Sequence, residues 1–487
     1  MPDGSPPPNT ASKPQLYASR VKILPKSVSG FYRRLKWQML WLLLAIYYVA
    51  PWLRWDRGPG APDQAILVDA GQGRLFFFMI EIWPQEVYYL TGLLIMAAIG
   101  LFLATSLAGR VWCGYACPQT VWTDLFIWVE RRIEGDRAER IRLDKAPWTV
   151  GKLARRTAKH TAWVLISLVT GGAWVMYFTD APTVLSDALR FDVSVTVLTF
   201  VGLFTATTYL LAGWAREQVC AYMCPWPRIQ SAMLDEHSLV VTYQAWRGDR
   251  RGAKRKSESW DDRTVKGLGD CIDCSQCVQV CPMGIDIRDG WNGDCINCGL
   301  CVDACAPIMD TVGRPRGLIS YDTLANSAAR AEGRPTHWTA IRPRTIVYAL
   351  ILLVVGAIMT GTLLLRPRLD VSVERDRAPL YVELSDGAIR NGYTVKISNM
   401  TRHAHSYALS VTGIPEAVVH VVGRDEQEGP VELEVRSDSI ATFRVTIKAP
   451  RDALKAASTD IAFNLAGQTH GEKAVYDSVF LAPEPMQ

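Results

Sequence analysis

Long apolar stretches alternate with polar segments along the chain as far as residue 365. A helix needs about 20 apolar residues to span the hydrocarbon core of a bilayer. Five segments reach or nearly reach this length, and none contains Asp, Glu or Lys: Trp37–Trp55, Val87–Ala108, Thr161–Phe178, Val193–Trp214 and Ile346–Leu365. The pattern therefore predicts an α-helical transmembrane bundle of about five spans.

Lys and Arg are unevenly distributed between these spans. The N-terminal tail, the loop from Arg110 to Lys159 and the loop from Ala215 to Thr345 are basic, whereas the loop Thr179–Asp192 has one Arg and three Asp. Cytoplasmic loops of membrane proteins carry an excess of Lys and Arg. The sequence therefore predicts that the N-terminus and the Cys-rich loop are cytoplasmic and that the C-terminal region is periplasmic.

Short runs that alternate apolar and polar residues dominate the chain after residue 365, and Asn, Asp and Gly separate them. About 120 residues of such runs are typical of an immunoglobulin-like β-sandwich. The predicted parts of the chain are a cytoplasmic tail over 1–36, transmembrane helices 1 to 4 over 37–215, a cytoplasmic segment over 216–345, a fifth transmembrane helix over 346–365 and a periplasmic all-β domain over 366–487.

Cysteine spacing adds the strongest chemical signal. Eight of the twelve cysteines form two Cys-x2-Cys-x2-Cys-x3-Cys runs. This spacing is typical of bacterial ferredoxins with two [4Fe–4S] clusters, in which the fourth Cys of each run binds the other cluster. An α+β ferredoxin-like domain is expected over about 262–312, with Cys271, Cys274, Cys277 and Cys305 on one cluster and Cys295, Cys298, Cys301 and Cys281 on the other.

Composition argues against several other classes of protein. The net charge of +5 is small for 487 residues, and no long basic run points to nucleic acid as a partner. The cysteines all lie in short spacings between Cys113 and Cys305, unlike those of a secreted disulfide scaffold. Zinc sites also use Cys-x2-Cys pairs, but two complete ferredoxin runs favour iron–sulfur clusters.

Two further motifs directly follow the second and fourth predicted spans. They are Cys113-Gly-Tyr-Ala-Cys117-Pro and Cys220-Ala-Tyr-Met-Cys224-Pro, and the shared Tyr indicates an internal repeat. Residues i and i+4 share a helix face, so the pairs could converge into one four-thiolate site. Soft thiolates select Cu(I), and dithiols also exchange electrons. Copper binding, electron exchange and a purely structural role are the open interpretations.

Several strings in the chain resemble the CcoG/FixG (RdxA) family of accessory proteins of cbb3-type cytochrome c oxidase. They are the two ferredoxin runs together with GRVWCGYACPQTVWTDLF, VERRIEGDR, EQVCAYMCPWPRIQSAM and RGLISYDT. The resemblance implies a bacterial inner-membrane protein with two [4Fe–4S] clusters that acts in oxidase assembly and reduces Cu(II) to Cu(I). The resemblance implies that the eight ferredoxin cysteines are the cluster ligands. It also implies that Cys113, Cys117, Cys220 and Cys224, which match the family's paired-thiol motifs, are candidates for catalysis and copper binding.

The partners implied are the lipid bilayer, a cytoplasmic electron donor, and oxidase subunits or assembly and copper-delivery proteins. Two other functions stay open. One is a general membrane polyferredoxin that passes electrons to a respiratory partner or quinone, and the other is a non-redox assembly scaffold. The sequence shows no dinucleotide fingerprint, so a nicotinamide or flavin donor would act through a partner.

Overall fold

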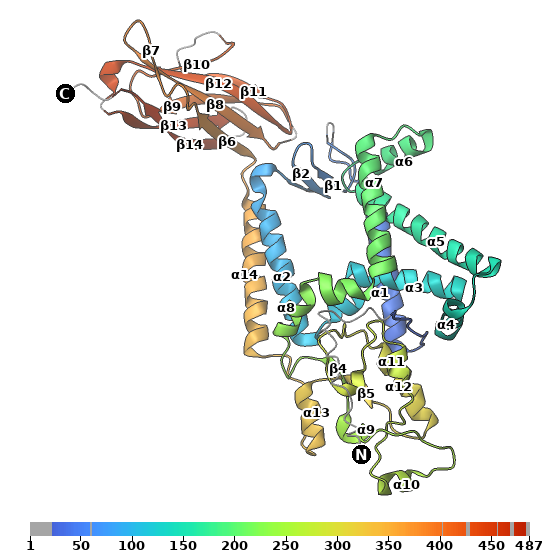
Figure 1. Cartoon of the computed structure of the whole chain (residues 1–487). Helices are drawn as coiled ribbons and strands as arrows, with labels where there is room; N and C mark the ends of the chain where they lie inside the picture. Colours follow the sequence, from blue (N-terminus) through green and yellow to red (C-terminus); the bar gives the residue numbers. More distant parts are fainter. Residues whose placement is uncertain are drawn as a thin grey trace, which may run out of the picture. The chain divides into compact units, whose positions relative to one another are not determined.

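The computed structural model describes residues 22–58, 61–401, 403–424, 429–454, 456–467 and 472–483. The chain divides into two compact units, one made of Met1–Arg54 and Gln64–Ala357 and the other of Trp55–Asp63 and Ile358–Gln487 (Figure 1). The first 21 residues of the predicted cytoplasmic tail lie outside the described residues.

Three described helices are long and apolar enough to cross a membrane: Pro84–Ala108, Val195–Ala215 and Pro343–Leu365. They correspond to α2 (Tyr88–Ala108) with the short turn before it, to α7 (Val195–Thr208) with the π-helix η4 (Tyr209–Ala215), and to α14 (Pro343–Leu365). These helices bury few of their residues. Apolar side chains that face outward in this way suit contact with lipid.

The other two predicted spans differ from the expectation. Trp37–Trp55 falls on α1 (Phe31–Val49) and a 3₁₀ turn, and Thr161–Phe178 falls on α5 (Val150–Val175). Both helices begin with Lys and Arg residues, so the apolar part of each is shorter than the helix itself. Three rather than five of the described helices thus meet the requirements of length and hydropathy for a span.

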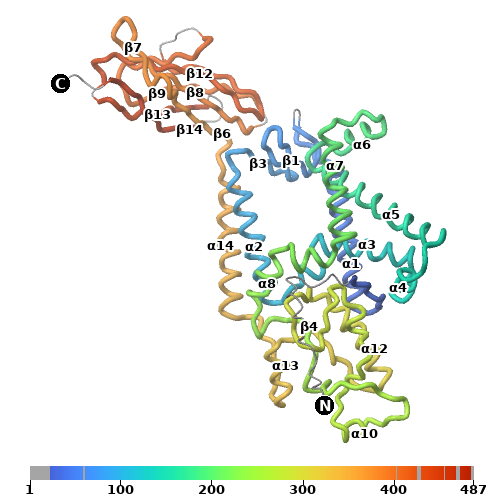
Figure 2. Tube along the Cα trace, viewed as in Figure 1, coloured from blue at the N-terminus to red at the C-terminus, as the bar shows by residue number. Residues whose placement is uncertain are grey.

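The long apolar helices have few neighbours within the first unit (Figures 1 and 2). Helix α7 packs on α5, and the rings of Phe102 in α2 and Tyr348 in α14 lie 6.2 Å apart. One antiparallel sheet consists of β1 (Ile66–Asp69), β2 (Arg74–Phe77) and β3 (Ile80–Ile82). The other helices are α3 (Pro118–Glu134), α4 (Arg137–Lys145), α6 (Ala181–Arg190) and α8 (Trp226–Met233).

A buried ion cluster ties α3 to its neighbours. Glu130 is 2% exposed and lies 2.8 Å from the guanidinium of Arg216, which directly follows η4. It also pairs with Arg140 of α4 and Lys159 of α5. Burial alone would raise the pKa of Glu130, but the three cations outweigh burial and lower it.

The cysteine-rich segment forms a small α+β domain. Strands β4 (Val240–Tyr243) and β5 (Ile319–Asp322) pair antiparallel, and helices α11 (Gln276–Gln279) and α12 (Leu300–Thr311) pack on each other between them in sequence. Short helices complete this part of the unit: α9 (Ala245–Gly248), α10 (Trp260–Val265) and α13 (Leu324–Ala331).

Helix α12 holds the start of α1. Asp303 accepts a hydrogen bond from the backbone N–H of Arg33 at 2.7 Å, which caps the N-terminus of α1. A Cβ at Gly30 would meet Asp303 at 2.2 Å, so only glycine fits at this crossing. The α+β domain is therefore packed against the helical part of its unit rather than hung from a linker.

The second unit contains a two-sheet β-sandwich. One sheet has the order β10-β12-β8-β6 with β7 also paired to β8, and the other has the order β11-β9-β13-β14. Buried side chains such as Tyr393, Val395, Phe463 and Phe480 fill the space between the sheets. The strands are β6 (Leu369–Arg375), β7 (Val382–Glu383), β8 (Ile389–Asn399), β9 (His405–Thr412), β10 (Val418–Val421), β11 (Val431–Val435), β12 (Ser439–Ala449), β13 (Ser458–Gly467) and β14 (Lys473–Leu481).

Candidate functional site

The two ferredoxin runs fold into loops with the same backbone pattern. Asp273 and Asn297, each two residues after the first Cys of its run, have φ of 54° and 53°, and Ser275 and Gly299, each following the second Cys, have φ of 53° and 71°. Left-handed residues inserted in a turn point successive backbone N–H groups into a concavity that binds anions, including iron–sulfur clusters. The repeat therefore extends from sequence to conformation.

Cys305 comes together with the three cysteines that begin the other run. Burial raises its pKa to about 12, and the thiols of Cys277, Cys274 and Cys271 contribute further to this shift. Cys274 is exposed, whereas Cys271 and Cys277 are buried. These are the four residues predicted to hold one cluster.

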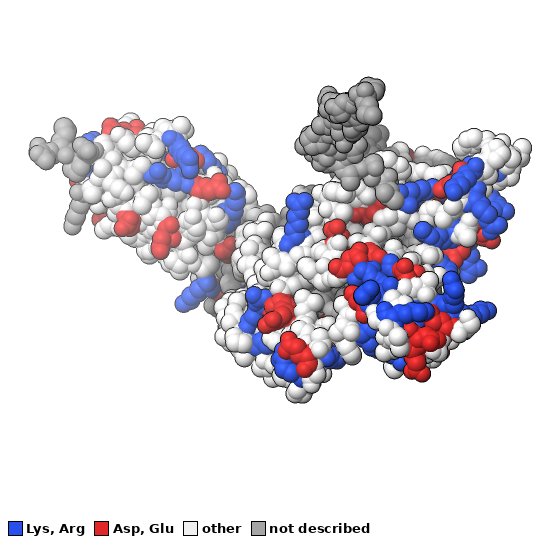
Figure 3. Space-filling view, turned by 60° about the horizontal axis from the view of Figure 1, so that its bottom comes forward, with Lys and Arg blue, Asp and Glu red and all other residues white. Residues whose placement is uncertain are grey.

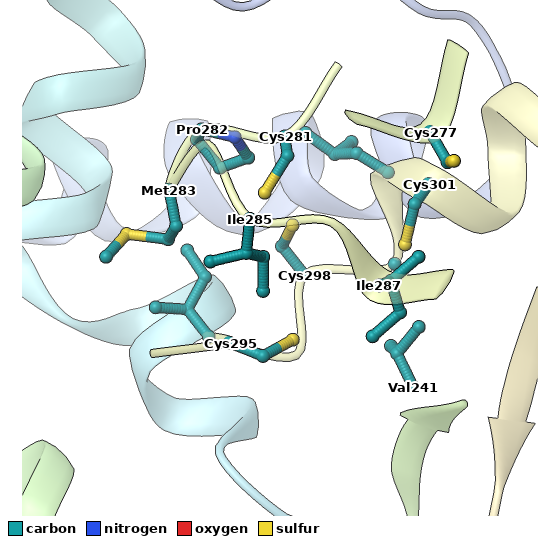
Figure 4. A pocket seen from close by; sticks show the side chains of 13 residues that line it. Val241, Cys277, Cys281, Pro282, Met283, Ile285, Ile287, Cys295, Cys298 and Cys301 are labelled. Atoms are coloured by element: carbon teal, nitrogen blue, oxygen red, sulfur yellow. The ribbon is translucent and has the colours of Figure 1, made fainter. Parts of the chain in front are cut away.

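The second set surrounds an apolar cavity (Figure 4). In the figure the sulfur atoms of Cys281 and Cys298 point toward one another, with Cys295 and Cys301 beside them. Burial, followed by the charges of Cys298 and Cys295, raises the pKa of Cys281 to about 12. The cavity is also lined by Cys277 and by apolar side chains that include Val241, Met283, Ile285 and Ile287.

These residues fit [4Fe–4S] clusters. Thiols, apolar walls and anion-binding loops supply the ligands, the low-dielectric surroundings and the N–H donors that such clusters need. In the described part of the chain, no three Cys, His, Asp or Glu residues are close enough to hold a single metal ion. The four thiolates that bind a [4Fe–4S] cubane lie farther apart than thiolates that share one metal ion, so the wide spacing of these cysteines is compatible with clusters. The crossed assignment of ligands stays a prediction.

The two paired-thiol motifs have matching backbones. Each lies on a π-helix, η3 (Trp112–Ala116) or η5 (Val219–Met223), and its second Cys, Cys117 or Cys224, is extended. The N–H of Cys117 donates to Trp112 and that of Cys224 donates to Val219, both at 2.8 Å. Four residues before each first Cys, Gly109 and Arg216 have φ of 65° and 46°. The internal repeat is thus also present in the backbone.

The four thiols of these motifs lie within electrostatic reach of one another. Burial raises the pKa of Cys220 to about 12, and Cys117, Cys113 and Cys224 contribute in that order. The Cys113 thiol donates to the side-chain oxygen of Gln230 at 2.9 Å, and burial raises its pKa. The structure therefore brings together the four cysteines singled out in the sequence.

The first motif also packs directly on a ferredoxin loop. The Tyr115 hydroxyl donates to the carbonyl oxygen of Cys298 at 3.0 Å, and a Cβ on Gly114 would meet the Ile296 oxygen at 2.6 Å. Cys113, Cys298 and Leu300 belong to one buried apolar cluster. In the second motif, by contrast, Tyr222 and Met223 are exposed.

The sequence pattern assigned no role to two residues that lie at this site. Arg110 is 1% exposed, hydrogen-bonds the carbonyl of Gly293 and acts electrostatically on the Cys113 thiol. Gln230 is fully buried between Cys113 and Thr105. Both lie within the strings that carry the family resemblance, but neither is a recognisable ligand, so spacing assigned them no role.

The fold and these cysteine sites define an iron–sulfur protein with helices that suit a membrane. Family models agree: a 4Fe-4S dicluster domain matches residues 215–324, a 4Fe-4S binding domain matches 90–135, and an IG-like fold at the C-terminus of FixG matches 359–483. The immunoglobulin-like prediction for the C-terminal domain is confirmed.

Full-length relatives identify the family. The nitrogen fixation protein FixG of Rhizobium meliloti is 46% identical over 96% of this chain and 94% of its own length. Protein RdxB of Cereibacter sphaeroides is 49% identical over 96% of this chain and 97% of its own, and RdxA of the same organism is 48% identical over 92% and 94%. The chain belongs to the FixG/RdxA family, as its motifs predicted.

Several solved structures each match about a quarter of the chain. The crystal structure of a FixG-related protein from Vibrio parahaemolyticus is 25% identical, with a TM-score of 0.21, and the match covers 24% of this chain and 97% of that one.

Proposed function

We propose that this protein passes single electrons from the ferredoxin cysteines to the thiols of Cys113, Cys117, Cys220 and Cys224, and that Cu(II) is the final acceptor. The observation that carries the proposal is the packing of Tyr115 and Gly114 on the loop that holds Cys298. Clusters held by thiolates supply one-electron chemistry at low potential. This contact gives the electrons a short path between the two sets of cysteines.

Cu(II) suits this position chemically. One electron converts one Cu(II) to Cu(I) with no proton transferred, and soft sulfur ligands favour the reduced ion. A cavity of about 30 Å³ beside Cys220 is also lined by Met283, Glu217 and Asp124. That volume accommodates an ion or a water molecule, and the thioether of Met283 adds a soft donor to the thiol.

We place this reaction in the assembly of a cbb3-type cytochrome c oxidase, where Cu(I) would go to the haem–copper centre. Membership of the FixG/RdxA family supports this role. The partners would be oxidase subunits or assembly and copper-delivery proteins, as the motifs implied. The immunoglobulin-like domain supplies a surface for such partners on the periplasmic side.

We also propose an inner-membrane topology with five crossings, in which α1 and α5 cross with their apolar halves while the basic halves stay cytoplasmic. The ferredoxin domain would then face the cytoplasm, where a donor protein reduces it. Cys274 is the exposed member of the eight cluster cysteines, which makes its cluster the natural entry point. Figure 3 shows basic and acidic side chains interspersed on the face in view, so a donor that approached this face would meet charges of both signs.

A second candidate acceptor is a quinone, and one pocket favours it. A pocket of about 350 Å³ is lined by aromatic side chains of α1, α3, α5 and α7, namely Tyr47, Trp122, Trp174 and Phe204. Its volume lies in the range typical of small-molecule sites. Gln119, two residues after Cys117, also lines it. A flat ring bound here would lie close to the thiols.

The test is an anaerobic reduction. The full-length protein in detergent is reduced, excess reductant is removed, and Cu(II) is added in the presence of a chelator specific for Cu(I). Cluster reoxidation matched by an equal amount of Cu(I), and lost in Cys274→Ser, supports copper as the acceptor. Clusters that stay reduced with Cu(II) but reoxidise with a soluble quinone overturn copper in favour of the quinone.

A further inference from the structure

The strongest unassigned feature of the molecule is a buried positive charge beside the paired thiols. Arg110 is 1% exposed, and no described carboxylate forms an ion pair with it. Its Nε atom has no hydrogen-bond partner among the described residues. Other buried arginines of this unit, such as Arg33 and Arg216, pair with Asp124 and Glu130. Burying a cation without an anion is unfavourable, so a negative partner would stabilise Arg110 in this position.

The groups that Arg110 faces are cysteines. Its guanidinium acts electrostatically on the thiols of Cys113, Cys220 and Cys295. Arg110 therefore lies between the paired thiols and the second ferredoxin loop. Thiolates bound to a metal centre would supply the anionic charge that no carboxylate provides here.

Two matched half-sites contribute these thiols. The first motif on η3 and the second on η5 have the same π-helical turn, the same i to i+5 hydrogen bond and the same extended second Cys. Cys117 is also the N-cap residue of α3, a helix of 17 residues whose N-terminus favours negative charge. Two equivalent pairs that converge are what a symmetric four-ligand centre requires.

The spacing of the thiols favours a cluster over a single ion. Thiolates around one tetrahedral metal ion, with metal–sulfur bonds of about 2.3 Å, lie within about 4 Å of each other. Among the described residues neither these four cysteines nor the ferredoxin cysteines are close enough for a single ion. The 4Fe-4S family model over 90–135 includes Cys113 and Cys117.

We propose that Cys113, Cys117, Cys220 and Cys224 together hold a third [4Fe–4S] cluster, with Arg110 as its buried counter-charge. The inference deepens the proposed electron transfer but does not depend on copper as the acceptor. Copper would then be reduced near these thiols rather than bound by them. One electron would pass from a ferredoxin cluster to this centre, and no atoms would be exchanged.

The test counts iron and acid-labile sulfide in the full-length protein, reconstituted anaerobically. Three clusters give about 12 of each per chain, and two give about 8. Cys220→Ser/Cys224→Ser is expected to lose about four irons while the electron paramagnetic resonance signals of the ferredoxin clusters persist. Cys274→Ser is the matched control, because it removes a ferredoxin ligand and should leave the third cluster in place.

Two results would overturn the inference. One is wild-type protein that saturates at about 8 irons, with the same content in the double variant. The other is one copper or zinc atom per chain that disappears with Cys220 and Cys224. If the double variant does not fold, the iron count and Mössbauer spectrum of the wild-type protein still distinguish two clusters from three. About 8 irons with Cu(I) formation would reject only this inference, whereas about 12 irons without Cu(I) would reject only the copper proposal.

Discussion

Gly114 lies so close to the carbonyl oxygen of Ile296 that a Cβ at position 114 would stand 2.6 Å from it. Gly114 belongs to the first paired-thiol motif, and Ile296 lies between Cys295 and Cys298 on the second ferredoxin loop. The backbones of two segments far apart in sequence therefore touch without intervening side chains. That close contact joins the first paired-thiol motif to the second ferredoxin loop, backbone against backbone.

Gly114→Ala should weaken this contact. Because the opposing atoms are backbone, they cannot rotate away, and the π-helix must shift at a cost of about 1–3 kcal/mol. We expect a lower melting temperature in detergent and slower electron transfer from the ferredoxin clusters to any acceptor, measured by stopped-flow absorbance.

Gly151→Ala is the matched control, since a Cβ at Gly151 on α5 meets nothing within 4 Å. This change should leave both the melting temperature and the transfer rate as in wild type or slightly improve stability. Equal effects of the two substitutions would show that the contact has no functional importance.

The internal repeat provides a second matched pair. Tyr115 is buried and donates to the Cys298 carbonyl, whereas Tyr222, at the same place in the second motif, is 67% exposed. Tyr115→Phe removes the hydrogen bond to Cys298, worth about 1 kcal/mol, and a longer one to the Tyr321 hydroxyl at 3.4 Å. Tyr222→Phe removes none that is seen among the described residues. Thermal unfolding should separate the two variants, and identical melting curves would argue against a stabilising role for the Tyr115 hydroxyl.

Strand prediction in the C-terminal domain succeeded where alternation was regular. The sequence alternates regularly over 431–435, which coincides with β11, and over 393–397, which lies inside β8. Strands β13 and β14 have a less regular sequence pattern. Their burial alternates in part, but the polar residues Asp460 and Asn464 of β13 and Asp477 of β14 interrupt the apolar pattern.

At the candidate site, spacing indicated which cysteines belong together but not what surrounds them. The grouping of Cys305 with the first run follows from a known repeat, and the structure places those thiols near one another. The buried Arg110 and the Gly114 contact depend on packing between segments more than 180 residues apart in the chain, as the bond from Arg110 to Gly293 shows. No local pattern reports such contacts.

Crossed ligation makes a specific prediction for ligand variants. Cys305→Ser should abolish the same cluster signal as Cys274→Ser, because both thiols belong to one group. Cys281→Ser should instead match Cys298→Ser. Redox titration followed by electron paramagnetic resonance distinguishes the two signals by potential. If Cys305→Ser altered the same signal as Cys298→Ser, the ligands would be grouped by run and the crossed assignment would be wrong.

The ion cluster around Glu130 should stabilise the second motif. Glu130→Gln leaves Arg140, Arg216 and Lys159 without their shared anion, which typically costs about 3–5 kcal/mol for a buried pair. Because the pKa of Glu130 is lowered in the fold, its contribution is present above the ordinary Glu pKa of about 4.3 and is lost as pH falls further. The melting temperatures of wild type and variant should therefore converge at acid pH.

Glu332→Gln is the control for that experiment. Glu332 pairs with Arg334 at 2.6 Å, but both side chains are 62% exposed. Exposed pairs contribute about 0–1 kcal/mol, so the melting temperature should hardly change at any pH. A loss as large as that of Glu130→Gln would contradict the assignment of a special role to the buried cluster.

Arg110 should set the potential of whatever centre the paired thiols hold. Reduction adds negative charge beside its buried guanidinium, so the cation favours the reduced state. A unit charge about 5 Å away at an effective dielectric of about 20 contributes about 3 kcal/mol, on the order of 100 mV for one electron. Arg110→Met should therefore lower the midpoint potential of this one centre by an amount on the order of 100 mV, whereas Arg110→Lys, which keeps the charge, should retain most of the wild-type potential.

The ferredoxin cluster of Cys271 and Cys305 serves as the internal reference in the same titration, since no interaction links Arg110 to those residues in the described structure. A Met variant with unchanged potentials at every centre would show that Arg110 only supports the fold through Gly293.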